Sequence, residues 1–77
     1  MGEKAFAALC RKTIADYAKC SENDVYIVWM CKTLQNNKAL ASTIMSDGMY
    51  YEITYNGDKG EVYVDAYKKE HNFMIII

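Results

Sequence analysis

A chain of 77 residues forms one small domain, close to the lower limit at which a single hydrophobic core holds a protein together without cross-links. Hydrophobic residues make up 52% of it and charged residues 25%, which predicts a folded globular protein and argues against intrinsic disorder. A net charge of −1 argues against binding to nucleic acid or to an anionic membrane through overall charge.

The first twenty residues have the periodicity of an amphipathic helix. Side chains of one helical face recur at spacings of three and four residues, and most positions between them are charged or alanine. This face consists of Phe6, Leu9, Cys10, Thr13, Ile14 and Tyr17. We therefore expect a helix from about residue 3 to about residue 19, followed by a polar break at residues 21–24.

Four strands are expected after this break. Residues 25–34, VYIVWMCKTL, are rich in β-branched and aromatic residues and apolar on both faces, as in a central strand, and a turn is expected at residues 36–38. Residues 39–46 form the second strand, which ends at Asp47-Gly48, a dipeptide typical of type I′ hairpin turns. Residues 49–55 and 61–68 form the third and fourth strands around a loop with two glycines.

The chain ends in an apolar tail, NFMIII, which either adds an edge strand or folds back over the core. The sum of these elements is an α+β fold. We expect one domain, residues 1–77, in which the N-terminal helix packs on an antiparallel four-stranded meander, with the tail as a candidate extra edge strand. The consecutive isoleucines of the tail also make a homodimer through the C-terminal edge an expectation.

Strand parity divides the last hairpin into two faces. Val62, Val64 and Ala66 are expected to face the helix, as is the apolar set of the third strand, Tyr51, Ile53 and Tyr55. The opposite face should be uncovered and should carry three tyrosines and three carboxylates, namely Tyr50, Glu52, Glu61, Tyr63, Asp65 and Tyr67. One interpretation is a solvated sheet face built from good strand formers. The other is that these six residues bind a basic partner protein, since tyrosine supplies rigid amphipathic contact area.

No residue set in the sequence predicts catalysis or a cofactor. The only histidine, His71, stands in the tail, and the carboxylates of the last hairpin should be solvated. Cys10, Cys20, Cys31 and His71 are the residue types of a Cys₃His zinc site, but their spacings of ten, eleven and forty residues match no zinc finger or ribbon. We expect a protein that is not an enzyme, has no cofactor or metal, and does not bind nucleic acid directly, because its aromatic surface is acidic.

The location expected from the sequence is intracellular. No export signal is present, and the longest apolar run is far shorter than the ~20 residues needed to span a membrane. An odd number of cysteines in such a chain predicts reduced thiols.

Three segments, CKTLQNNKAL (31–40), SDGMYYE (46–52) and YNGDKGE (55–61), are the most specific parts of a resemblance that covers residues 24–69. This region resembles a family of small proteins of temperate phages and prophages of Gram-positive bacteria. The family has no established biochemical activity, so the resemblance implies no catalytic residues. It implies a phage accessory protein in the cytoplasm of a bacterial host that binds and inhibits a host protein.

Anti-CRISPR inhibitors of Cas9-type nucleases are one class of such proteins, and they commonly offer acidic side chains to surfaces that hold nucleic acid. The acidic tyrosine face is compatible with that class. The alternative is a self-associating structural or replication-accessory phage protein without a host target.

Overall fold

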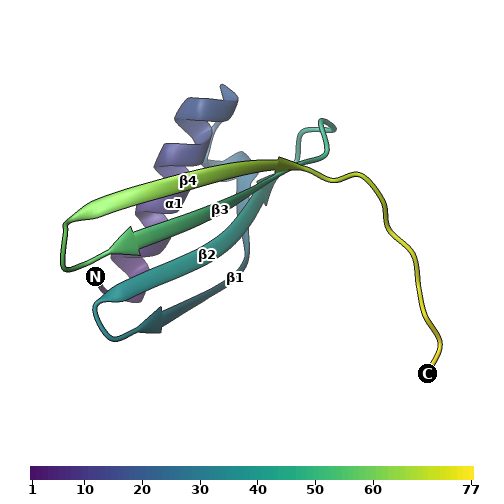
Figure 1. Ribbon diagram of the computed structural model, residues 1–77. Helices are drawn as coiled ribbons and strands as arrows, with labels where there is room; N and C mark the ends of the chain where they lie inside the picture. The colour runs from purple at the N-terminus through teal and green to yellow at the C-terminus, as the bar shows by residue number, and fades with distance from the viewer.

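One helix packs against one face of a four-stranded antiparallel sheet (Figure 1). The computed structural model describes residues 1–77. The elements are α1 (Glu3–Ala18), the 3₁₀ turn η1 (Glu22–Asp24), β1 (Val25–Thr33), β2 (Asn36–Thr43), β3 (Met49–Asn56) and β4 (Glu61–Lys68). The strands neighbour one another in sequence order, so β1 is an edge strand and its expected character as a central strand is wrong. The predicted α+β fold, a helix on a four-stranded meander, is confirmed.

Local hydrogen bonds determine where the helix ends and the sheet begins. α1 ends at Ala18, and the next residue, Lys19, caps it by adopting the left-handed conformation with φ of 61° and donating its N–H to the Ala15 carbonyl. The polar break then closes into a capping box, in which Ser21 Oγ accepts from the Asn23 N–H at 3.3 Å and Asp24 Oδ2 accepts from the Ser21 N–H at 3.2 Å. The chain therefore turns sharply into β1.

The core lies between α1 and the first three strands. Its nine buried hydrophobic residues are Phe6, Cys10, Ile14, Ala15, Val25, Ala39, Ala41, Tyr51 and Ile53. The two alanines of β2 leave space for the helix to approach the sheet closely. At the C-terminal end of the helix, the Tyr17 ring meets the Tyr51 ring edge to face, with centroids 5.9 Å apart.

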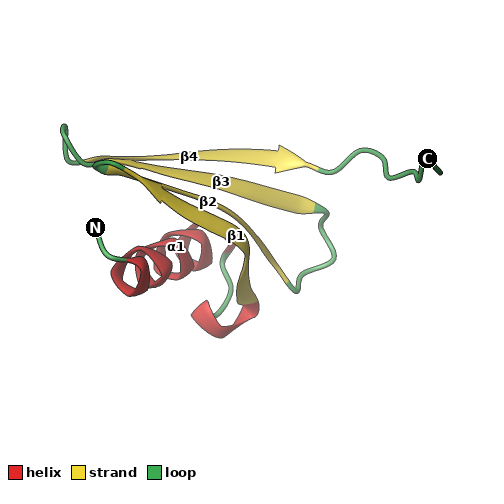
Figure 2. Ribbon diagram, turned by 90° about the horizontal axis from the view of Figure 1, so that it is seen from below, coloured by secondary structure: helices red, strands yellow, loops and turns green.

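β4 is exposed on both faces. Val62, Val64 and Ala66 lie on the helix side of the sheet as predicted, since Val64 pairs with Ile53, but Val62 and Val64 are each 38% exposed. The expectation that the helix covers them is wrong. A helix is about 10–12 Å wide and strands are about 4.8 Å apart, so one helix covers two or three strands. In Figure 2, β4 is the strand farthest from α1.

Both predicted hairpin turns between β1 and β3 differ from the structure. The first turn is Leu34–Gln35 and not residues 36–38, because Asn36 already pairs with Thr33 in the sheet. The second connection is a five-residue loop, residues 44–48, in which only Gly48 has positive φ, so it is no type I′ turn. Asp47 Oδ1 accepts the Met49 N–H at 3.0 Å and shapes this loop.

The tail, residues 69–77, forms no strand and does not fold back over the core, so neither predicted arrangement is present. It leaves the end of β4 and extends away from the sheet (Figure 1). Its apolar side chains, from Phe73 to Ile77, are all at least 72% exposed. The tail stays exposed because α1 does not extend over β4, so there is no apolar surface beside β4 in which the tail could be buried.

Candidate partner-binding face

The sheet face opposite α1, called the open face below, is covered by no other element (Figure 2). The strand register aligns its side chains in rows that cross all four strands. The four rows are Tyr26–Ser42–Tyr50–Tyr67, Trp29–Leu40–Glu52–Asp65, Cys31–Lys38–Thr54–Tyr63 and Thr33–Asn36–Asn56–Glu61. The open face therefore has aromatic residues on both edge strands, and its middle is mostly polar apart from Leu40 and Tyr50.

All six predicted binding residues lie on this face, in β3 and β4. Tyr50 stands directly opposite Tyr67, and Glu52 stands directly opposite Asp65. Glu61 and Tyr63 are adjacent on the same side of β4, where Tyr63 Oη donates a hydrogen bond to Glu61 Oε1 at 3.0 Å. The sequence had predicted this placement correctly from parity. Whether these residues bind a partner stays a prediction.

The open face carries an excess of negative charge on its β4 side. Lys38 Nζ lies 3.5 Å from Glu52 Oε1, whereas Asp65 forms no ion pair although it faces the Glu52 carboxylate across the strands. Like charges directly opposite one another destabilise a sheet, so a cation brought to Asp65 relieves a repulsion. The hydrogen bond to Glu61, together with its negative charge, raises the pKa of Tyr63 and keeps its hydroxyl protonated.

Two aromatic residues of the open face were not found from the sequence. Tyr26 and Trp29 are three positions apart, and simple alternation places them on opposite faces. A β-bulge between Ile27 and Trp29 inserts Val28 as an extra residue, so both aromatic side chains point to the open face. They are 43% and 44% exposed, respectively. Only the register with β2 shows this, because Ile27 pairs with Ala41 and Trp29 with Leu40.

Ser42 fixes the centre of the aromatic row. Its side chain is buried between Tyr26 and Tyr50, its cross-strand neighbours, and its Oγ donates a hydrogen bond to the Met49 carbonyl at 2.6 Å. This bond ties β2 to the start of β3 at the edge of the 44–48 loop. The tyrosines on both sides therefore flank a buried, hydrogen-bonded residue.

A family comparison covers nearly the whole chain, with a match to residues 3–77. The chain belongs to the DUF6275 family of unknown function. No curated protein and no solved structure matches it.

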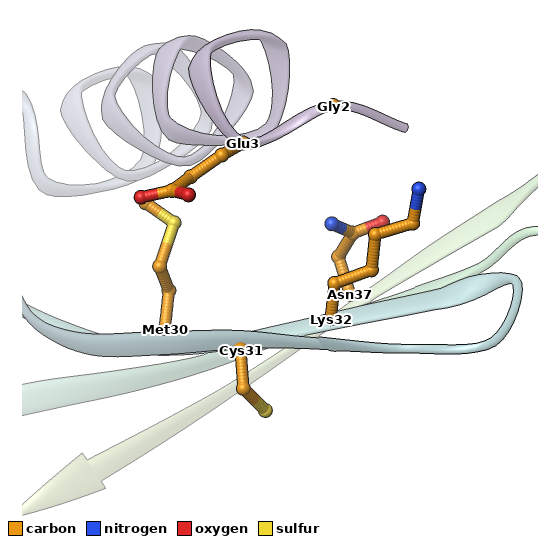
Figure 3. A pocket seen from close by; sticks show the side chains of 6 residues that line it. All are labelled: Gly2, Glu3, Met30, Cys31, Lys32 and Asn37. Atoms are coloured by element: carbon orange, nitrogen blue, oxygen red, sulfur yellow. The ribbon is translucent and has the colours of Figure 1, made fainter.

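A second feature of the DUF6275 chain is a hollow of about 310 Å³ between the start of α1 and the β1–β2 hairpin (Figure 3). Lys32 and Asn37 point into it toward Gly2 and Glu3, while Cys31 points to the open face. Asn37 is buried, and its Nδ2 donates to the Met1 carbonyl at 3.0 Å, whereas its Oδ1 accepts no hydrogen bond from the protein. The hollow is polar but brings together no nucleophile with a base.

The residues considered for zinc lie far apart in the DUF6275 fold. Cys10 is buried in the core, where burial raises the pKa of its thiol to about 11, and Cys31 is exposed on the open face. Cys20, which follows the C-terminal end of α1, is half-buried, and burial together with the negative charges of Asp24 and Asp47 raises the pKa of its thiol. Nowhere in the structure do three potential metal ligands lie close together. The His71 ring lies against Phe73 in the tail, with the two ring centroids 5.6 Å apart.

No helix is long and apolar enough to cross a membrane.

Proposed function

We propose that this DUF6275 protein is a non-enzymatic binding protein whose open face docks on a basic surface of a partner protein. The observation that supports the proposal is the combination of exposed aromatic area and unpaired acid on one uncovered sheet face. Tyr26, Trp29, Tyr63 and Tyr67 are each between 43% and 52% exposed. Tryptophan and tyrosine are the residues that contribute most often to binding energy at protein interfaces.

The charge of the open face indicates the chemistry of the partner. Three carboxylates stand against one ammonium group, Lys38, and the carboxylates lie on the β3–β4 side while Trp29 lies on the β1 side. A partner that fits this face offers apolar or aromatic contacts to the β1 side and lysine or arginine to Asp65. Arginine suits both tasks, because its guanidinium pairs with carboxylates and stacks on aromatic rings.

The resemblance to small phage and prophage proteins supports a finer proposal. The partner is then a host protein met in the bacterial cytoplasm, and the function is inhibition, most concretely of a Cas9-type CRISPR nuclease. A basic nucleic-acid channel of such a nuclease has the charge that Asp65 and Glu61 require. Three carboxylates suit the blocking of a short stretch of such a channel and not the imitation of a long nucleic acid.

The test is capture of partners from a bacterial lysate by the immobilised protein, followed by calorimetric titration of the purified partner. A Tyr63→Ala/Asp65→Asn variant removes the β4 side of the face, and Trp29→Ala removes the β1 side. We expect each variant to weaken binding at least tenfold, since the two sites lie on one face. The matched control is Tyr17→Ala/Asp16→Asn, which makes the same kind of change on exposed residues of α1.

Equal binding by the wild-type protein and both open-face variants, with native circular dichroism spectra, would show that the face is not the binding site. Loss with Tyr63→Ala/Asp65→Asn but not with Trp29→Ala would restrict the site to the last hairpin. A protein that captures no partner but self-associates strongly would favour the alternative of a structural or replication-accessory protein.

A further inference from the structure

The two edges of the sheet differ in how well they are protected from pairing. β1 carries the bulge at Val28, and bulges are one of the devices that prevent edge-to-edge association. β4 has no bulge and no proline, it pairs with β3 without a register shift over eight residues, and all eight residues are exposed. A long, regular edge strand of this kind is a template for another strand.

One hydrogen bond shows which backbone groups of β4 point outward. The Lys69 N–H donates to the Gly48 carbonyl at 2.7 Å, so the backbone groups of Lys69 point toward β3. Backbone groups alternate in direction along a strand, so those of Val62, Val64 and Ala66 point to the free edge. The same three residues carry the exposed apolar side chains on the helix side of β4.

We propose that β4 pairs antiparallel with β4 of a second copy of this chain, with Val64 on the two-fold axis. In this register Val64 faces Val64 of the second copy, and Val62 faces Ala66. Each of these residues offers its outward N–H and carbonyl to the other copy. The two helices then lie on the same side of one continuous sheet.

Charge and side-chain matching select this register over its neighbours. A shift that centres the pair on Asp65 places two Asp65 carboxylates directly opposite one another, and a shift that centres it on Tyr63 places Glu61 opposite Asp65. Like charges in directly opposed positions are destabilising. In the register centred on Val64, Tyr63 of one copy faces Asp65 of the other, so each Asp65 carboxylate, which has no ion pair within its own chain, stands opposite an uncharged side chain whose hydroxyl stays bonded to Glu61.

The register centred on Val64 also joins the uncovered apolar side chains of both copies. Val62, Val64 and Ala66 of each copy form one strip on the helix side, where α1 does not reach. The open faces join on the opposite side and form a two-fold symmetric surface. The inference goes beyond the proposed function and does not rest on it, because it concerns the protein alone.

The test is sedimentation velocity of the full chain over a range of concentrations, with no partner present. The wild-type protein should shift toward twice the 8.8 kDa mass of the single chain as concentration rises. Val64→Lys places two ammonium groups opposite each other on the axis and should weaken dimerisation at least tenfold. Val28→Lys is the matched control on the other edge and should dimerise as the wild type does.

A wild-type protein that is monomeric at every concentration overturns the proposal. So does equal dimerisation of the Val64→Lys and Val28→Lys variants. An Ile75→Asp/Ile76→Asp variant tests the tail, and loss of the dimer in this variant alone would show that the tail carries the association in place of β4.

Disulfide formation tests the register in a second way, with Cys20→Ser/Cys31→Ser as the background. Opposed residues of a hydrogen-bonded pair have Cα atoms about 5.5 Å apart, within the range that a disulfide bridges. Val64→Cys should therefore cross-link two copies rapidly under mild oxidation. Asp65→Cys should not, because the two Asp65 positions are diagonal neighbours about 7–8 Å apart in this register. Faster cross-linking of Asp65→Cys would overturn the Val64-centred register.

Discussion

The incomplete cover of the sheet by α1 predicts very different costs for truncating two neighbouring side chains. Ile53 in β3 and Val64 in β4 are cross-strand partners on the same face. Ile53 is 0% exposed, whereas Val64 is 38% exposed. Truncating a fully buried isoleucine to alanine costs about 2–5 kcal/mol, since the lost transfer energy adds to the cost of the cavity.

The value for Val64→Ala follows from its exposure. Two methyl groups are lost, each worth about 0.8 kcal/mol when fully buried, and the exposed share of the side chain lowers the sum to about 1 kcal/mol. A 77-residue domain has a total free energy of unfolding of roughly 4–12 kcal/mol at about 0.05–0.15 kcal/mol per residue. Ile53→Ala therefore removes a large share of the stability, and Val64→Ala a small one.

The assay is urea unfolding followed by circular dichroism, at a protein concentration low enough to keep the chain monomeric. Similar losses for the two variants would refute the reasoning, because they would mean that β4 is covered as completely as β3. Repeating the measurement at high concentration adds a second readout. If β4 pairs with a second copy, the cost of Val64→Ala rises with concentration while that of Ile53→Ala does not.

Three further predictions concern backbone conformation and one buried thiol. Leu34 has positive φ, so Leu34→Gly should stabilise the protein by about 0.5–1 kcal/mol in urea unfolding, whereas Leu34→Ala should give no gain. Gly57→Ala should lower the free energy of unfolding by more than about 2 kcal/mol, because a Cβ there overlaps the Gln35 carbonyl. Gly60→Ala should lower it by only about 1 kcal/mol, because the only cost at this position is the strain of a positive φ. Burial raises the pKa of Cys10 from 9.0 to about 11, so the folded state holds the thiol proton more tightly than the unfolded state. This tighter binding of the proton adds at most about 2.7 kcal/mol to the free energy of unfolding. The addition is fully present below pH 9 and is lost as the pH rises toward 11. Cys10→Ala should therefore flatten the pH dependence of the free energy of unfolding in this range.

Local periodicity predicted those parts of the fold that depend on nearby residues. The helix was expected at about residues 3–19 and spans Glu3–Ala18, and β4 has the expected bounds. The turn between β1 and β2 was misplaced because Asn36 and Asn37 resemble turn residues while serving long-range contacts. Asn36 Oδ1 accepts the Gly57 N–H across the sheet, and Asn37 bonds to the Met1 carbonyl. Composition alone does not reveal such contacts.

The candidate site, too, was predicted from the sequence only in part. Its β3–β4 half followed from the alternation of side chains, because these two strands pair without irregularity. Its β1 half could not be predicted from alternation, because the extra residue Val28 moves the side chains that follow it in β1 to the opposite face of the sheet. Trp29 was therefore missed. The reach of α1 was missed for a similar reason, since it depends on the width of a helix relative to the spacing of strands.

The open face and the free β4 edge share one residue, Asp65, and a single substitution separates the two proposals. In the proposed dimer, Asp65 faces the uncharged Tyr63 of the second copy, whose hydroxyl donates to Glu61 of its own chain, so asparagine fits the same place. Toward a basic partner protein, Asp65 contributes charge, which asparagine lacks. Asp65→Asn should therefore leave the dimer constant within about tenfold, because a neutral polar contact is worth only about 0.5–1.5 kcal/mol and about 1.4 kcal/mol corresponds to tenfold.

The same variant should weaken partner binding and reduce its dependence on salt, since a charge-assisted contact becomes a neutral one. Sedimentation velocity measures the first effect, and calorimetric titration at two ionic strengths measures the second. If Asp65→Asn abolished the dimer but left partner binding unchanged, Asp65 would belong to the self-association surface alone. The acidic character of the open face would then rest on Glu52 and Glu61, of which Glu52 is already paired with Lys38.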